Sequence, residues 1–184
     1  MLMTAPHRCA TVIARPNGVQ EEMAKAIVKS RKATSAATPM KNIDLASANR
    51  IIAKGFALAR RRKHPPLTLC VVDKGGYIVS SQREDESSTF QFEIAFGKAW
   101  TCTALGHSTT YIEKNMAENR PHFVDSLGAA SAGRFIPTRG GVLIRDPRRN
   151  KIIGALGVTG DTGENDEALA VEAIGKCGFK ADLG

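Results

Sequence analysis

Two strand–turn–strand patterns constrain the fold of this chain more than any other feature of its sequence. In the first pattern, an apolar, β-branched run at 67–73 and a second run at 77–82 flank a Lys-Gly-Gly turn. In the second pattern, the runs 141–145 and 151–159 flank a turn that begins Asp-Pro. Short strand-like runs joined by turns of this composition are typical of β-hairpins. Two hairpins predict a sheet that is mainly antiparallel.

Helical patterns lie before, between and after the two hairpins. Asp44 is expected to cap a helix that ends near Arg62, because apolar residues follow it at three- and four-residue spacing. The segment 90–105 is apolar on nearly all sides of a helix and is therefore expected to be buried. A short helix is expected after Ser108, and a final helix at 164–176 has acidic residues in its first turn. Helices packed against an antiparallel sheet predict an α+β fold.

The basic character of the chain belongs to its N-terminal third. The 184 residues carry a net charge of +8, but residues 1–66 contain thirteen Lys and Arg against three Asp and Glu, whereas residues 67–184 are slightly acidic. We interpret residues 1–40 as a basic, partly helical N-terminal extension, and residues 41–184 as one domain. No nucleic-acid-binding motif accompanies the charge, so no nucleic-acid partner is expected.

Several classes of protein are excluded by what the sequence lacks. No apolar run approaches the roughly 18–20 residues of a membrane span, so no membrane partner is expected. The first residues do not resemble a secretory signal, which predicts a cytoplasmic protein. Cysteine occurs at Cys9, Cys70, Cys102 and Cys177 without any paired spacing, so structural free thiols are expected in place of a zinc site.

Three charged residues are candidates for catalysis because of their apolar surroundings. Glu93 and Lys98 lie within the apolar segment 90–105, and Arg134 lies in a loop of small residues beside Phe135. A lone buried charge is costly, so each of these residues should have a partner or line a cleft. They form either an acid–base site or a structural salt bridge, and the sequence leaves both interpretations open.

A glycine-rich loop marks a possible binding site for an anionic group. The loop 157–163 leads directly into the final helix, where free backbone amides can bind an anion or a carboxylate. The alternative is that Asp161 caps these amides internally. We predict a pocket where this loop, the loop 134–141 and the helix of Glu93 and Lys98 converge. Gly141 and Asp161 are then candidate ligand-binding residues, since glycine lets a backbone approach a ligand closely.

Histidine offers one candidate metal ligand. His7, His64, His107 and His122 show no spacing that is typical of a metal site within one segment. His107 follows the apolar helix in a loop, where a neutral imidazole can bind an iron atom or accept a proton. The alternative is a histidine that faces solvent without a function.

Four stretches in order along the chain resemble the GlcG/HbpS family, which includes the C-terminal domain of PduO-type proteins. They are LTLCVVDKGGYIVSSQRED, EIAFGKAWTCTALG, GRFIPTRGGVLIRD and IIGALGVTGDTGENDEALAVEAIGKCGF, and the resemblance extends from about Asn42 to the C-terminus. It implies a profilin-like, three-layer α/β/α sandwich and a homo-oligomer. It also implies binding of haem or a related small-molecule ligand, with haem degradation or storage in some members and a place among catabolic genes in many.

Three functions follow as hypotheses. In the first, the chain is a GlcG-like haem-binding protein, in which Phe92, Phe96, His107 and either Arg134 or Arg139 hold the haem. In the second, it is a catabolic lyase or isomerase without a cofactor, acting on a small carboxylate or an aromatic compound. Glu93 then acts as acid or base, and Arg134 anchors the carboxylate. In the third, it is an oligomeric accessory protein without chemistry.

Overall fold

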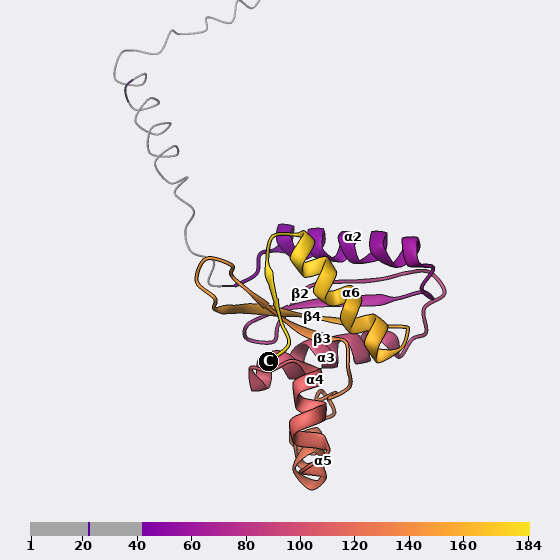
Figure 1. The fold of residues 1–184 in the computed structure, drawn as a ribbon, viewed down its shortest axis with the longest axis vertical. Coiled ribbons are helices and arrows are strands. Elements are labelled where there is room, and N and C mark those ends of the chain that lie inside the picture. The colour runs from indigo at the N-terminus through magenta and orange to yellow at the C-terminus, as the bar shows by residue number, and fades with distance from the viewer. Residues whose placement is uncertain (1–21, 23–41) are drawn as a thin grey trace, which may run out of the picture. The chain divides into compact units, whose positions relative to one another are not determined.

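The computed structural model describes residue 22 and residues 42–184 of the chain. The predicted N-terminal extension, 1–40, lies almost entirely outside the described residues, and its boundary stays a prediction. The described elements, in order, are α2 (Leu45–Arg62), β1 (Thr68–Asp73), β2 (Ile78–Arg83), α3 (Gln91–Leu105), α4 (Thr109–Ile112), the π-helical turn η1 (Glu113–Ala117), α5 (Pro121–Ala130), β3 (Gly141–Arg145), β4 (Ile152–Thr159), α6 (Gly163–Lys176) and β5 (Lys180–Asp182). Figure 1 shows their arrangement.

The strands form one five-stranded sheet in the order β2-β1-β4-β3-β5, and every neighbouring pair is antiparallel. Both predicted hairpins are present, as β1–β2 and β3–β4. The two hairpins are joined through β1 and β4, whose register pairs Thr68 with Thr159 and Asp73 with Gly154. This pairing brings the segments just before β1 and just after β4 to the same edge of the domain. The predicted antiparallel α+β fold is confirmed.

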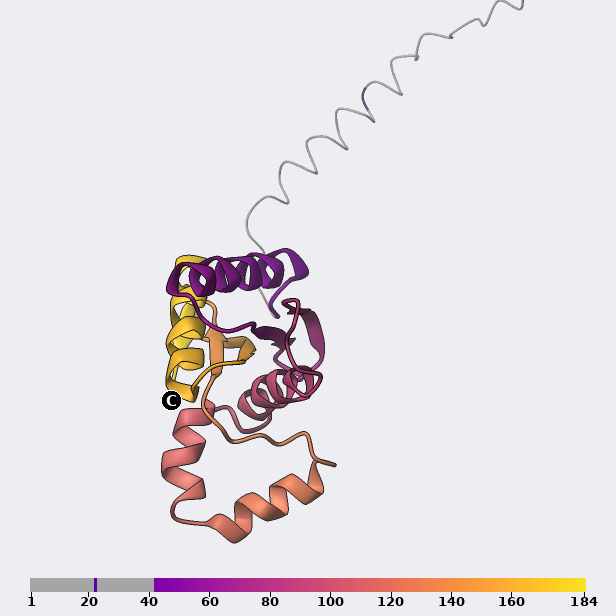
Figure 2. The same ribbon diagram turned by 90° about the vertical axis from the view of Figure 1, so that its right-hand side faces the viewer.

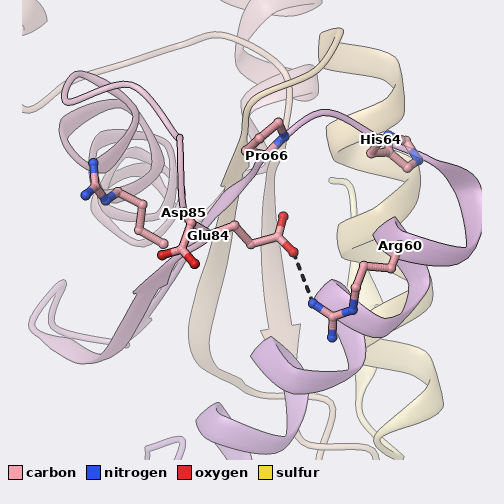
Figure 3. A pocket seen from close by; sticks show the side chains of 6 residues that line it. Arg60, His64, Pro66, Glu84 and Asp85 are labelled. Atoms are coloured by element: carbon pink, nitrogen blue, oxygen red, sulfur yellow. Dashed lines mark hydrogen bonds and ion pairs between the residues drawn. The ribbon is translucent and has the colours of Figure 1, made fainter.

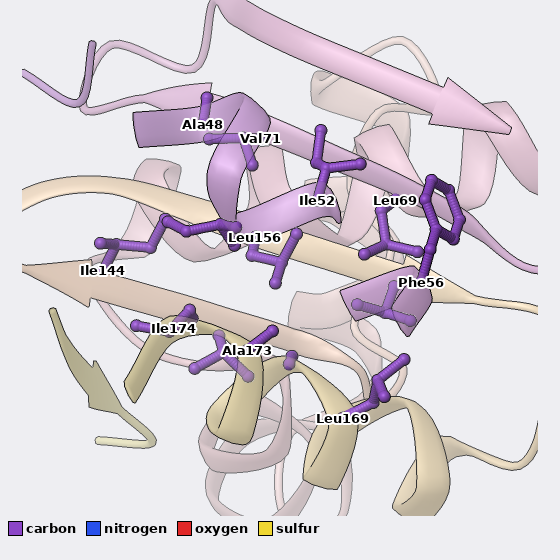
Figure 4. Packing of buried hydrophobic residues seen from close by; sticks show 14 of the residues in the cluster. Ala48, Ile52, Phe56, Leu69, Val71, Ile144, Leu156, Leu169, Ala173 and Ile174 are labelled. Atoms are coloured by element: carbon purple, nitrogen blue, oxygen red, sulfur yellow. The ribbon is translucent and has the colours of Figure 1, made fainter. Parts of the chain in front are cut away.

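The larger core lies between the sheet and the helices α2 and α6 (Figure 4). Alternate strand residues point to opposite faces of a sheet, so Leu69 and Val71 of β1 face these two helices. Leu156 of β4 and Ile144 of β3 join them there, with Phe56 of α2 packed against the same cluster. This face is therefore lined by large branched side chains.

The opposite face of the sheet is covered by α3 and is lined by small side chains. Its cluster consists of Cys70, Val72, Ala95, Ala99, Cys102, Leu143 and Ala155. A methyl group on Gly157 of β4 would lie only 1.9 Å from the carbonyl oxygen of Ala95. Glycine at this position lets the backbone of α3 approach the sheet closely. The three-layer sandwich predicted from the family resemblance is confirmed, and Figures 1 and 2 show α4 and α5 projecting from it.

Two expectations about the elements are wrong, and one strand was missed. The helix α3 is not buried on all sides, because Phe92 is 38% exposed on its outer face. The ten-residue helix α5, which begins at Pro121, is longer than the short turn that this proline predicts. The short strand β5, which pairs with β3, had no counterpart in the sequence pattern. None of the described helices is long and apolar enough to cross a membrane.

Candidate functional site

Lys98, on the sheet-facing side of α3, forms a buried ion pair. Its Nζ donates hydrogen bonds to the carbonyl oxygen of Val158, at 2.8 Å, and to Oδ2 of Asp166, at 3.2 Å. The side chains of Lys98 and Asp166 are only 5% and 2% exposed. Burial lowers the pKa of Lys98 and raises that of Asp166, and each charge opposes the shift of the other. Since either charge alone would be costly at this depth, the two residues depend on each other.

The loop between β4 and α6 satisfies most of its backbone amides internally. Oδ1 of Asp166 accepts a hydrogen bond from the amide of Asp161 at 3.2 Å, and Oδ1 of Asp161 accepts one from the amide of Thr162 at 2.7 Å. Thr162 caps α6 by accepting from the amide of Asn165 at 3.3 Å. The geometry therefore favours internal capping of these amides over binding of an anion. Thr162 caps α6, and Asp161 accepts a hydrogen bond from the Thr162 amide.

The remaining oxygen of Asp161 binds a histidine that is distant in sequence. Oδ2 of Asp161 lies 2.5 Å from Nδ1 of His64, and the His64 side chain is only 7% exposed. Although burial raises the pKa of Asp161, hydrogen bonds from Thr162 and His64 outweigh it and leave that pKa below its ordinary value. The contact follows from the pairing of β1 with β4. A methyl group on Gly160 would lie 2.5 Å from the carbonyl oxygen of Pro66.

A hollow of about 480 Å³ opens beside His64 (Figure 3). Its lining is almost wholly polar: Arg60, His64, Pro66, Arg83, Glu84 and Asp85. Glu84 is fixed there, because its two oxygens accept hydrogen bonds from Arg60 Nη1, at 3.1 Å, and from the amide of Leu67, at 3.0 Å. Arg83 donates to the carbonyl oxygen of Ser87. The polar lining suits a small polar molecule better than a large apolar one.

Three aromatic side chains lie at four-residue spacing along α3, and we call them the aromatic face: Phe92, which is exposed, and Phe96 and Trp100, which are partly buried. The rings of Phe92 and Phe96 are stacked, with centroids 6.4 Å apart. The guanidinium of Arg134 lies 4.9 Å from the Trp100 ring, in a cation–π contact. The aromatic face is therefore a partly exposed apolar surface with one exposed cation at its side.

His107 is half-buried just after the C-terminal cap of α3. Its ring stacks on that of Tyr111, with centroids 4.1 Å apart. Within residues 42–184, no hydrogen bond involves either ring nitrogen of His107, so these nitrogens are available to a ligand. In the described part of the chain, no three His, Cys, Asp or Glu residues are grouped so as to hold a metal ion. His107 therefore offers a single donor, as an axial haem ligand would.

Arg139 and Gly141 have structural partners that account for them. Arg139 donates from Nε to Glu113 at 2.8 Å and from Nη1 to Glu164 at 2.7 Å, so two carboxylates offset its charge. The amide of Gly141 donates to Thr109 Oγ1 at 2.9 Å. A methyl group on Gly141 would lie 2.8 Å from the Cys102 sulfur. This glycine makes room for the helices that cover the sheet. Roles of Arg139 and Gly141 in ligand binding stay predictions.

The expected burial of Glu93 is wrong, because Glu93 is exposed on α3. No hydrogen bond or ion pair joins it to Lys98 or Arg134 among the described residues, so the three candidates for catalysis are not in contact with one another. The predicted convergence of segments holds for Lys98 and the loop of Asp161, which are linked through Asp166. Catalytic roles for Glu93, Lys98 and Arg134 stay predictions.

No sequence pattern assigned His64 or Asp166 to the site. His64 and Asp161 are 97 residues apart, and no spacing rule connects them. One feature of the sequence could have identified Asp166. This residue lies in the first turn of an amphipathic helix at a position that packs inward, and a buried carboxylate requires a cation as its partner. Lys98, on the sheet-facing side of α3, was the available partner.

This chain matches a family model and is similar to a known bacterial protein. A family model described as "Haem degrading protein HbpS-like" matches residues 43–175. An "Uncharacterized 15.0 kDa protein in dhaT-dhaS intergenic region" of Citrobacter freundii is 30% identical over 109 residues, which is 59% of this chain and 74% of that protein.

Two solved structures share the fold. The crystal structure of Klebsiella pneumoniae protein ORFY matches with a TM-score of 0.67 and 27% identity, covering 78% of this chain and 94% of that one. The crystal structure of the PduOC:heme complex matches with a TM-score of 0.64 and 20% identity, covering 77% of this chain and 99% of that one.

Proposed function

Since the chain belongs to the HbpS-like family of haem-degrading proteins, we propose that it binds haem or a closely related flat ligand. The observation that carries the proposal is the aromatic face of α3, with its stacked phenylalanines and its adjoining arginine. A porphyrin needs an apolar surface for its ring, a cation for its propionates and an axial donor for its iron. The haem complex of a structural relative supports the same choice of ligand.

The residues available to haem are a subset of those expected from the sequence. The aromatic face supplies apolar area, Arg134 is exposed and can pair with a propionate, and His107 has free ring nitrogens. Arg139 is a poorer propionate partner, because Glu113 and Glu164 already offset its charge. Bound haem iron would supply redox and oxygen chemistry, which is the basis for proposing haem degradation or an accessory role in catabolism.

The aromatic face also supports self-association. One chain offers an apolar surface to only one side of a flat ligand. A second copy would cover the other side and would bury Phe92, which is 38% exposed in the single chain. We propose a homo-oligomer that buries this face of α3. Sedimentation at micromolar concentration is expected to show an oligomer, and a monomer would contradict this assembly.

A haem titration followed by visible absorption tests the proposal. We expect Phe92→Ala and Arg134→Ala each to weaken binding, and His107→Ala to change the Soret band. Phe123→Ala is a matched control, because Phe123 on α5 is also 38% exposed and also contacts an arginine, Arg120. Equal effects of Phe92→Ala and Phe123→Ala, or a wild-type protein that does not bind haem, would contradict the proposal.

The catabolic lyase or isomerase stays an alternative. It would use Glu93 as acid or base and Arg134 as carboxylate anchor on a small carboxylate or aromatic compound. The geometry favours this alternative less, because Glu93 is exposed and is not in contact with Arg134 among the described residues. The cytoplasmic location also stays a prediction, and cell fractionation tests it.

A further inference from the structure

The hollow beside His64 is separate from the aromatic face and from the family-based proposal for haem. Of the residues predicted to form a site, only Asp161 takes part in it, as the partner of His64. A histidine that bonds a carboxylate through one ring nitrogen and lines a hollow is the arrangement of a general base.

The hydrogen bond to Asp161 determines which nitrogen of His64 is available. Nδ1 is bonded to Asp161 Oδ2 at 2.5 Å, which leaves Nε2 as the only ring nitrogen free to meet a ligand. Within residues 42–184, no hydrogen bond engages Nε2. A carboxylate on Nδ1 keeps the proton there in the neutral ring and leaves the lone pair on Nε2. Nε2 is thus prepared to accept a proton.

A chain of contacts holds this base in place from the interior. Asp161 is oriented by the amide of Thr162, and its own amide donates to Asp166, which forms the buried ion pair with Lys98. Asp161, Asp166 and Lys98 are positioning residues in this arrangement, since they act on His64 through one another. Through this connection, the buried ion pair also helps to position His64.

Arg60 gives the hollow an anchor for an anion. One of its nitrogens pairs with Glu84, while its side chain is 65% exposed, so further N–H groups face solvent. Glu84 is held in place by Arg60 and by the amide of Leu67. A carboxylate-bearing molecule can therefore pair with Arg60 and lie beside His64. A volume of about 480 Å³ suits a small molecule of this kind.

We propose that this hollow binds small 2-oxo carboxylates and that His64 moves a proton at the carbon next to their carbonyl group. The C–H bond breaks, the proton passes to Nε2 of His64, and the electron pair remains as an enolate, whose negative charge Arg60 offsets. Return of a proton from His64 to the same carbon restores the substrate. No oxidant, reductant or metal enters this balance. The reaction class is proton transfer, as in isomerases and lyases.

Hydrogen–deuterium exchange tests the proposal directly. The full chain is incubated with pyruvate in D₂O, and loss of the methyl proton signal is followed by NMR. We expect exchange above the buffer rate. His64→Gln should reduce it by about 100-fold or more, and Asp161→Asn by about 10- to 100-fold, because the amide keeps the shape of Asp161 but not its charge. His122→Gln, on the exposed side of α5, should leave the rate unchanged.

The outcomes separate the two proposals made for this protein. Exchange at the buffer rate, or exchange that His64→Gln leaves intact in a protein with native circular dichroism, would overturn the proton transfer. Binding of pyruvate without exchange would also overturn it. If Asp161→Asn does not fold, His64→Gln alone decides. The haem titration of His64→Gln is expected to match that of the wild type, so failure here leaves the haem proposal to its own test.

Discussion

Replacing Asp166 by asparagine should destabilise the protein strongly at neutral pH and much less at alkaline pH. The change leaves Lys98 buried, with only the Val158 carbonyl to bind, and with its side chain 5% exposed. Removing one partner of a buried ion pair costs about 3–5 kcal/mol of unfolding free energy. The shape of residue 166 and its acceptor for the Asp161 amide are preserved, so the loss reports mainly on the charge.

The free energy of deprotonating Lys98 sets an upper limit on this loss of stability. Burial already lowers the pKa of Lys98, and removing Asp166 takes away the contact that opposes this shift. The lysine can escape by losing its proton. At pH 7 this costs about 4.6 kcal/mol, because an unfolded lysine has a pKa of about 10.4 and each pH unit is worth about 1.36 kcal/mol. At pH 9 the same step costs only about 1.9 kcal/mol.

The stability of the Asp166→Asn variant is therefore expected to rise with pH. A lysine with a lowered folded pKa binds fewer protons in the folded state than in the unfolded state, so stability rises with pH between its folded pKa and about 10.4. Urea unfolding of Asp166→Asn and wild type at pH 7, 8 and 9 should show a difference of about 3–5 kcal/mol that shrinks to about 2 kcal/mol at pH 9.

Asp182→Asn is the control for this experiment. Asp182 accepts from Arg145 Nε at 2.5 Å in a partly exposed pair. An arginine does not lose its proton in this range, so the difference should be about 1 kcal/mol or less and constant from pH 7 to 9. If the cost of Asp166→Asn is equally small, or does not change with pH, then Lys98 is hydrated or mobile and the argument for a buried charge is wrong.

Three further outcomes are expected. Gly157→Ala should cost about 3 kcal/mol or more in urea unfolding, because its methyl group would lie 1.9 Å from the Ala95 carbonyl oxygen, whereas Gly128→Ala, which meets open space in α5, should be neutral or stabilising. Asp161, with a lowered folded pKa, should contribute stability that is present above pH 4 and is lost as the pH falls through the folded pKa; Asp161→Asn should flatten acid unfolding in that range. Deletion of residues 1–38 should leave a folded core by circular dichroism, and an insoluble product would contradict the predicted domain boundary.

The sheet and most of the helices were predictable, because their signals are local. The turn residues and alternating apolar runs mark both hairpins, and Asp44 caps α2 by accepting from the amide of Ser47 at 2.6 Å. The missed strand β5 is only three residues long, and its pairing with β3 depends on where α6 returns the chain. No local pattern can specify an element of that length.

The candidate site was less predictable, because it depends on which face of α3 meets the sheet. Apolar residues surround this helix, so hydrophobic periodicity alone gave Glu93 and Lys98 the same environment. The size of the side chains carried the missing information: Ala95, Ala99 and Cys102 lie on one face and match the small residues of β4. Lys98 belongs to that face and Glu93 does not. The contact of His64 with Asp161 follows only from the pairing of β1 with β4.

The position of β1 and β4 at the centre of the sheet has a consequence for synthesis of the chain. β1 can pair with β2 as soon as both have left the ribosome, but its other edge waits for β4, which begins about 80 residues later. At about 5–20 residues per second, this wait is about 4–16 s. During that time a strand whose residues are nearly all buried in the finished domain has one open edge, and unpaired edges invite association with other chains. We therefore expect the nascent protein to benefit from chaperones that shield apolar strands until translation reaches β4.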